Sequence, residues 1–199
     1  PNHDASTDFP SLLTEFEKYD VIVLSDIGAN TLLLHPDTFI HGKRTVNRLS
    51  LLEEWVSQGG SLVMAGGYLS FQGIQGSASY HGTKVEDILP VNIFPYDDRL
   101  EIPEGSIPKV VTEDHPILTS IDNSWPFLLG LNKVAAKEGA EVILEAEGYP
   151  LLVAGEYGKG RSVAWTTDIG PHWCPEEFLN WNGFGKLWHN ILKWCVKKL

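Results

Sequence analysis

The chain has 199 residues, of which 43% are hydrophobic, enough for one domain over 1–199 with a substantial buried core. Its formal net charge of −11 disfavours nucleic acid as a partner, because nucleic-acid binding depends on clustered Lys and Arg. No apolar run approaches the ~20 residues needed to cross a bilayer, so we expect no membrane partner.

The cysteine and histidine content is equally informative. Neither Cys174 nor Cys195 belongs to a Cys-x-x-Cys pair or has zinc-ligand spacing, and the histidines show no metal-binding pattern. No motif indicates a cofactor. A domain of this size does not need a disulfide, which favours a reducing, cytoplasmic location. The chain begins with Pro1 rather than Met, and a further strand upstream of Pro1 is one alternative.

The first half of the chain predicts a strand, a helix and a second strand. The apolar run at 21–24 favours a parallel strand that is covered on both faces. Apolar residues then recur at helical spacing from Val46 to Val56, and Gly59-Gly60 provides a helix stop before a second apolar run at 62–65. These elements predict a right-handed βαβ unit with parallel strands.

The second half predicts antiparallel strands and a final helix. Four prolines between 92 and 121 indicate an irregular insertion with edge strands. A strand is expected at 141–145, and the segments 151–156 and 161–166 flank a glycine-rich turn as an antiparallel hairpin. Apolar spacing from Phe184 to Cys195 predicts a helix that packs on the sheet. Together the two halves predict an α/β fold with a mostly parallel central sheet.

A tight glycine turn follows the strand at 62–65. An α/β enzyme places its nucleophile at such a turn, because the sharp bend projects the side chain and aims backbone N–H groups at a developing oxyanion. Here the turn reads Gly66-Gly67-Tyr68, and neither glycine carries a reactive atom. The pattern therefore indicates a scaffold more firmly than a reaction.

The order of elements resembles the class I glutamine amidotransferase-like superfamily, particularly its trehalose-utilisation-like and amidotransferase-like branch. The resemblance covers most of the chain, and its landmarks are the segments 19–28, 59–67, 158–165 and 168–173. It implies a flavodoxin-like three-layer α/β/α sandwich. It also places the family's nucleophilic cysteine at Gly67, or at Gly66 after a one-residue shift, which implies that ordinary glutaminase chemistry is absent.

The resemblance implies roles for three further residues. Gly28 falls where the family places oxyanion-hole backbone, and His172 and Glu176 fall where it places the histidine and acid that activate the cysteine. The spacing from His172 to Glu176 departs from the His-Pro-Glu of active members.

Two residues near His172 carry chemistry of their own. Cys174 is the only substitute nucleophile, because a thiol needs a neighbouring base to form a useful thiolate, but it lies off the glycine turn. Asp168 could orient His172 as a general base, since ligand contacts gather in loops after the carboxyl ends of strands. The alternative for Asp168 and His172 is a purely structural loop.

Other residues are candidates for ligand binding. Asp26 could bind a ligand hydroxyl or cation, or could cap the turn that follows it. Tyr68 and Gln72 could bond a polar ligand above the turn, or could form a wall that closes it. Trp173 could stack on a sugar ring, or could pack in the core.

Three hypotheses follow from these observations. The first is an amidotransferase-like domain without glutaminase activity, which binds a small polar molecule or a protein partner at the carboxyl ends of its strands. The second is a carbohydrate-related hydrolase or isomerase that uses His172 and Asp168 together with Tyr68. The third is a structural or assembly module. A homo-oligomer is a further alternative.

Overall fold

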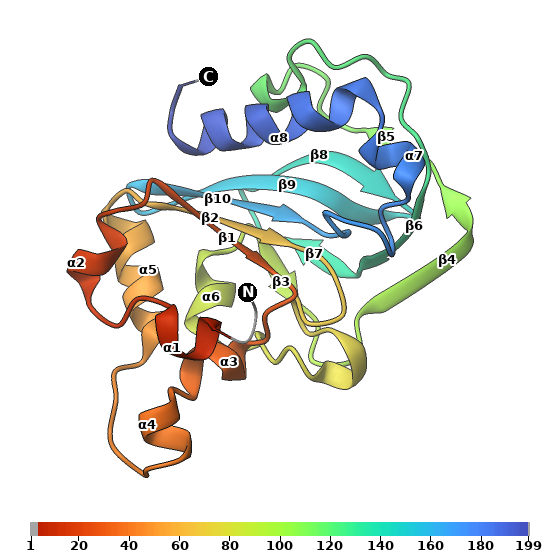
Figure 1. Cartoon of the computed structure of the whole chain (residues 1–199). Helices are drawn as coiled ribbons and strands as arrows, with labels where there is room; N and C mark the ends of the chain where they lie inside the picture. Colours follow the sequence, from red (N-terminus) through yellow and green to blue (C-terminus); the bar gives the residue numbers. More distant parts are fainter. Residues whose placement is uncertain (1–3, 199) are drawn as a thin grey trace.

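A six-stranded sheet lies between two layers of helices in the computed structural model, which describes residues 4–198 (Figure 1). The strand order is β1 (Val21–Ser25), β2 (Ser61–Ala65), β10 (Gly160–Trp165), β9 (Tyr149–Tyr157), β8 (Glu141–Ala146) and β5 (Lys109–Val110). Strands β1, β2 and β10 are mutually parallel, and each later pairing is antiparallel. Four strands, β1, β2, β10 and β8, therefore run in one direction, and the expected α/β fold and β9–β10 hairpin are confirmed.

The βαβ unit forms as expected, with α5 (Arg48–Gln58) between β1 and β2. The Asn47 side chain accepts hydrogen bonds from the backbone N–H groups of Leu49 and Ser50, which begins the helix, and Gly59 ends it at a φ of 131°. All five residues of β2 are buried. Leu62 and Met64 join the core on the α5 side, and their neighbours along the strand join the core on the opposite side.

Strand β1 differs from its prediction. It lies at the edge of the sheet, and Val23 is 39% exposed. The expectation of a strand covered on both faces is therefore wrong. Apolar composition favours extended structure but does not fix a strand's place in the sheet order. The strand considered upstream of Pro1 lies outside the described residues.

The helices divide between the two faces of the sheet (Figure 1). Four short helices share the α5 face: α1 (Ala5–Asp8), α2 (Leu13–Phe16), α3 (Ala29–Leu33) and α6 (Lys84–Ile88). A fifth, α4 (Pro36–Phe39), projects away from the sheet (Figure 1). The opposite face carries α7 (Glu176–Leu179) and α8 (Asn182–Cys195), whose buried side includes Leu187, Ile191 and Trp194. Within residues 4–198, no helix has both the length and the apolar character of a membrane span.

The insertion at 92–121 is more regular than its prolines suggest. It contains most of β3 (Val91–Ile93), then β4 (Arg99–Ser106) and β5. Strand β3 pairs with β7 (Val134–Ala136), and β4 pairs with β6 (Leu128–Asn132). Strand β4 tolerates Pro103 because it has a single partner and the register shifts between Glu101 and Ser106. The β4–β6 ribbon lies beside the carboxyl end of β2.

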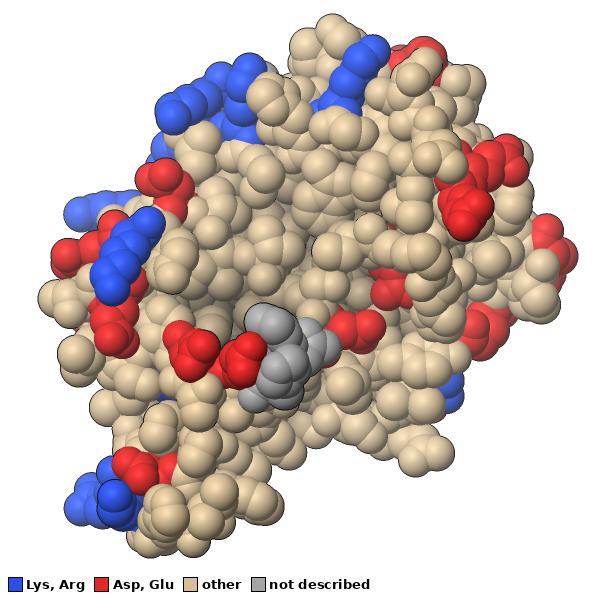
Figure 2. All heavy atoms as spheres, in the orientation of Figure 1, with Lys and Arg blue, Asp and Glu red and all other residues tan. Residues whose placement is uncertain are grey.

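Charge on the face shown in Figure 2 is predominantly acidic and scattered. Lys and Arg lie at the margins of this face, and Asp and Glu are spread across it. This face therefore offers no continuous basic surface of the kind that binds a nucleic-acid backbone.

Candidate functional site

The two glycines in the turn after β2 have different structural roles. Gly66 continues the sheet, and its N–H lies 2.7 Å from the carbonyl oxygen of Trp165 and 2.9 Å from that of Thr167. A Cβ on Gly66 would lie 2.3 Å from the carbonyl oxygen of Thr166, inside the sheet. Gly67 has a φ of 138°, and its missing Cβ points towards two carboxylates. Gly67 is therefore the position from which an elbow side chain would project.

Two carboxylates occupy the space that such a side chain would need. A Cβ on Gly67 would lie 2.5 Å from Oδ1 of Asp26 and 2.8 Å from Oδ1 of Asp168, closer than real Cβ atoms approach other heavy atoms. Asp26 follows β1, and Asp168 follows β10 by three residues. Because β1, β2 and β10 are parallel neighbours, their carboxyl ends bring these residues together.

Asp26 is fixed in an uncommon backbone conformation. Its φ is 50°, in the left-handed region that Asp and Asn adopt more readily than most residues. Its Oδ1 accepts a hydrogen bond of 2.8 Å from the Leu69 backbone N–H, and its own N–H donates to Ser70 Oγ at 3.2 Å. Asp26 thus takes up a backbone donor of the turn, the kind of group that stabilises an oxyanion in an active enzyme.

His172 pairs with Asp168 at the same edge of the sheet. Nδ1 of His172 lies 2.7 Å from Oδ2 of Asp168, and the same oxygen accepts a hydrogen bond of 3.0 Å from the Trp173 backbone N–H. The Asp168 side chain is 10% exposed, whereas that of His172 is 40% exposed. Burial raises the pKa of Asp168, and the charge of Asp26 raises it further. A buried carboxylate that orients an accessible imidazole is suited to general-base chemistry.

A pocket of about 350 Å³ opens over these groups. Its lining includes Asp26, Tyr68, Asp168 and His172, together with Ser25 and 169–171. Four of the residues selected from the sequence therefore share one pocket.

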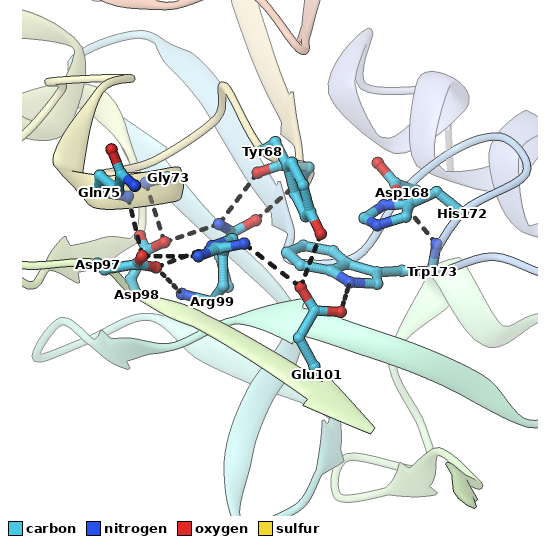
Figure 3. Close-up of polar contacts among 12 residues, drawn as sticks. Tyr68, Gly73, Gln75, Asp97, Asp98, Arg99, Glu101, Asp168, His172 and Trp173 are labelled. Atoms are coloured by element: carbon cyan, nitrogen blue, oxygen red, sulfur yellow. Dashed lines mark hydrogen bonds and ion pairs between the residues drawn. The ribbon is translucent and has the colours of Figure 1, made fainter. Parts of the chain in front are cut away.

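The walls around His172 are aromatic. The Tyr68 ring lies perpendicular to the imidazole at 4.5 Å between centroids, and the Trp173 ring stacks beside it at 5.1 Å. Both aromatic side chains reach Glu101, the Tyr68 hydroxyl at 3.0 Å and the Trp173 Nε1 at 2.8 Å (Figure 3). Trp173 is only 1% exposed and lies outside the pocket lining, so it is not accessible for stacking on a sugar ring.

Asn132 and Asp98 hold the glycine turn from below. Oδ1 of Asn132 accepts a hydrogen bond of 2.9 Å from the Gly67 N–H, and its Nδ2 donates to Asp98 at 2.8 Å. The fully buried Asp98 also accepts from the backbone N–H groups of Gln72 and Gly73. Burial raises the pKa of Asp98. None of these supporting residues is predicted from the sequence. Asp98 and Glu101 lie within the segment 92–121, which reads as irregular, and Asn132 lies beyond it.

A family model matches nearly the whole chain. The chain matches the GATase1-like family, described as "Putative glutamine amidotransferase", over residues 1–197. The chain belongs to this family. The family resemblance expected from the sequence is thus confirmed, and among curated proteins none matches the chain.

Solved structures extend the comparison. Two cytoplasmic proteins from Salmonella typhimurium, STM3548 and STM1381 (strain LT2), are 40% and 41% identical to this chain, with TM-scores of 0.95 and 0.94. Each match covers 98% of this chain and 79% of the Salmonella chain. A ThuA-like protein from Bacteroides uniformis matches with a TM-score of 0.60 at 15% identity, covering 98% of this chain and 75% of the other. This last likeness shows the fold alone.

Two of the residues selected from the sequence near His172 are not brought into the pocket. Cys174 is fully buried, and burial, assisted by the charge of Asp168, raises its pKa to about 12. A thiol with this pKa forms almost no thiolate near neutral pH, which argues against Cys174 as a substitute nucleophile. Glu176 is exposed at the start of α7, and the acid bonded to His172 is Asp168 instead. The family's histidine-to-acid assignment therefore does not transfer to Glu176.

Gly28 and Gln72 also lie outside the pocket lining. Gly28 packs against the backbone of Ala78, whose carbonyl oxygen accepts the following N–H, from Ala29, at 2.8 Å. The Gln72 side chain bonds within its own loop, to the Gly76 carbonyl oxygen and the His81 N–H. Neither residue is placed to bind a ligand in the pocket. Among residues 4–198, no cluster of three or more His, Cys, Asp or Glu could hold a metal ion.

Proposed function

We propose that this family member lacks glutaminase activity and binds a small polar molecule in the pocket between Asp26 and His172. One observation carries the proposal: carboxylate oxygens of Asp26 and Asp168 fill the side-chain space at Gly67. The turn therefore holds no thiol and has no room for one, while the pocket around it keeps polar groups. By extension from the Salmonella proteins, we place the chain in the cytoplasm.

The chemistry of the pocket restricts the ligand. Ionised carboxylates only accept hydrogen bonds, so the ligand must offer hydroxyl or amino donors to Asp26 and Asp168. Anions are disfavoured by these two groups and by the net charge of −11. A pocket of about 350 Å³ is near the lower end of the range for small-molecule sites, which suits a ligand of monosaccharide size. We therefore expect a small ligand that is either a neutral polyol or sugar, or a primary amine.

The absence of glutaminase activity is tested by ammonia release from glutamine. We expect no release above the rate without protein, from either the wild type or Gly67→Cys. The substitution supplies a thiol, but its Cβ would collide with the two carboxylates. Sustained turnover by the wild type, lost on replacement of Cys174, would contradict the proposal.

Ligand binding is tested by thermal shift against neutral sugars and polyols, primary amines and sugar phosphates. Binding to the native state raises the unfolding temperature, and we expect such a rise with compounds of the first two classes only. Asp26→Asn keeps the left-handed backbone but converts one carboxylate oxygen to a donor, so affinity should fall by roughly tenfold. Asp37→Asn, on α4 and outside the pocket lining, is the matched control. Stabilisation by phosphates alone would contradict this ligand class.

A second candidate function is supported by the short contact of 2.7 Å between His172 and the buried Asp168. This geometry suits a hydrolase or isomerase of small carbohydrates in which His172 moves a proton. Chromogenic glycosides and free sugars test it by hydrolysis and by sugar interconversion. Activity should be lost in both His172→Gln and Asp168→Asn and kept in Cys174→Ala. Activity that survives His172→Gln would exclude this role.

A further inference from the structure

One carboxylate on the β4–β6 ribbon bonds both aromatic rings that flank His172, of which Tyr68 lines the proposed pocket. The Tyr68 hydroxyl donates to Oε1 of Glu101 at 3.0 Å, and Nε1 of Trp173 donates to Oε2 at 2.8 Å (Figure 3). Each carboxylate oxygen therefore fixes one ring. Because the two rings flank His172 at centroid distances of 4.5 and 5.1 Å, their positions restrict the plane of the imidazole.

The ribbon also provides the surface on which Trp173 rests. Gly130 of β6 is the register partner of Glu101 in β4. A Cβ on Gly130 would lie 2.3 Å from Nε1 of Trp173, so the indole lies directly against bare backbone. The ribbon thus supplies both the contact surface for the indole and the acceptor for its N–H.

Arg99 places a positive charge beside this carboxylate. It precedes Glu101 by two residues and lies on the same side of β4. Its guanidinium carbon lies 4.8 Å from the centre of the Tyr68 ring, and its Nη1 lies 3.6 Å from Oε1 of Glu101. Asp97 holds the guanidinium through contacts of 3.0 Å to Nε and 2.8 Å to Nη2 (Figure 3). The position of Glu101 is therefore itself set by neighbours on the insertion.

Glu101 bonds one exposed group and one partly buried group. Its own side chain is 49% exposed and its bond to the Tyr68 hydroxyl is exposed, whereas its bond to Trp173 Nε1 is partly buried. The two rings also contact each other edge to face at 5.7 Å between centroids, and Glu101 adds a hydrogen bond to each of them. We infer that Glu101 is a positioning residue, which orients His172 by holding Tyr68 and Trp173. This inference rests on the proposed function, because a ligand in the pocket would meet His172 in the orientation that Glu101 imposes.

The test compares three variants of the ligand-free protein by NMR. Glu101→Ala removes both acceptors, whereas the amide of Glu101→Gln can accept from the Trp173 N–H and donate to the Tyr68 hydroxyl oxygen. Glu104→Ala, at an exposed position on the same strand, is the matched control. The readout is the chemical shift of the His172 ring proton Hε1, assigned by its loss in His172→Gln. This shift reports the two neighbouring rings through their ring currents.

We expect Glu101→Ala to move the Hε1 shift towards its value in the unfolded protein, with both Glu101→Gln and Glu104→Ala close to the wild type. Glu101→Gln and Glu104→Ala should unfold at the temperature of the wild type, whereas Glu101→Ala should unfold at a lower temperature because Trp173 Nε1 loses its acceptor. A folded spectrum of Glu101→Ala at the temperature of the comparison separates positioning from loss of fold. An unchanged shift in Glu101→Ala would overturn the inference. A change in Glu101→Gln as large as that in Glu101→Ala would also overturn it, because charge rather than geometry would then be responsible.

The outcome is distinguishable from that of the proposed function. The NMR comparison needs no ligand, so a failed ligand screen would remove the proposed function and leave the result on Glu101 in place. A successful screen with an unchanged Hε1 shift would remove only the role of Glu101. With a compound found in that screen, Glu101→Ala should weaken binding by roughly tenfold, and Glu101→Gln should restore most of it.

Discussion

Two of the histidine–carboxylate pairs among residues 4–198 have opposite patterns of burial. In His172–Asp168 the carboxylate is 10% exposed and the imidazole 40%, with 2.7 Å between them. In His115–Glu141 the imidazole is 2% exposed and the carboxylate 61%, with 4.0 Å between them. Of these two pairs, only the first presents an oriented imidazole to solvent.

The second pair is explained by local structure. Nδ1 of His115 accepts a hydrogen bond of 3.2 Å from the Ile117 N–H, which caps the short turn η2 (Pro116–Leu118), and its ring packs against Trp194. Burial lowers the pKa of His115, although Glu141 opposes this shift. Proximity of a histidine to a carboxylate is therefore weak evidence for chemistry. Burial alone does not decide the role either, because the His81 and Glu86 side chains, 45% and 13% exposed, share the pattern of the first pair but lie outside the pocket lining.

The largest expected effect is on stability, at the glycine that faces Asp168 of the first pair. Gly67→Ala should destabilise the protein by roughly 2–5 kcal/mol, because the backbone conformation is strained for Ala and the Cβ would displace Asp26 and Asp168 from their hydrogen bonds. Gly170→Ala, in the same pocket lining but with open space around its Cα, should change stability by less than about 0.5 kcal/mol. Chemical denaturation measures both, and equal effects would show that the carboxylates yield easily.

A smaller effect should separate the two carboxylates. Asp168→Ala leaves the buried N–H of Trp173 without its acceptor, which should cost about 1–3 kcal/mol. Glu141→Ala removes an exposed group and should cost less than about 0.5 kcal/mol. The comparison uses the same denaturation assay. If Glu141→Ala proved the more damaging, the contrast between the pairs would be lost.

The smallest effect is a pH dependence at His115. Its pKa in the folded protein lies below the ordinary value of 6.5, so on acidification the unfolded state takes up a proton that the folded state does not bind. Stability should therefore fall as the pH drops below about 6.5, towards the folded-state pKa. His115→Asn retains a capping acceptor and removes this part of the slope. Denaturation midpoints from pH 7.5 to 5 measure it, and parallel curves for wild type and variant would contradict the assignment.

Local sequence patterns identified the scaffold of the site. The apolar runs of β1 and β2, the helix stop at Gly59 and the β9–β10 turn are all encoded by neighbouring residues, so their elements form where expected. In the structure Asp26, Gly67 and Asp168 meet at one edge, because the parallel strands that they follow end together. The local pattern does not predict that β1 lies at an exposed edge, because the order of strands depends on contacts distant in sequence.

The supporting residues could not be found in this way. Asn132 and Glu101 reach the turn from β6 and β4, and neither strand has a clear sequence signal, since Pro103 interrupts one and Gly130 the other. Their pairing joins segments about 30 residues apart, and only that pairing aims their side chains at the site. The alternation of Arg99 and Glu101 indicates a polar strand face, but nothing local indicates what that face meets.

The filled space at Gly67 has a consequence for how this sequence can change. Replacing Gly67 by Cys alone would not give a working nucleophile, because Asp26 and Asp168 would have to change as well. Each carboxylate is in turn bonded to a backbone N–H, so replacing either one alone leaves that N–H without its acceptor. The three positions are therefore coupled, and a side chain at position 67 requires compensating changes at both carboxylates.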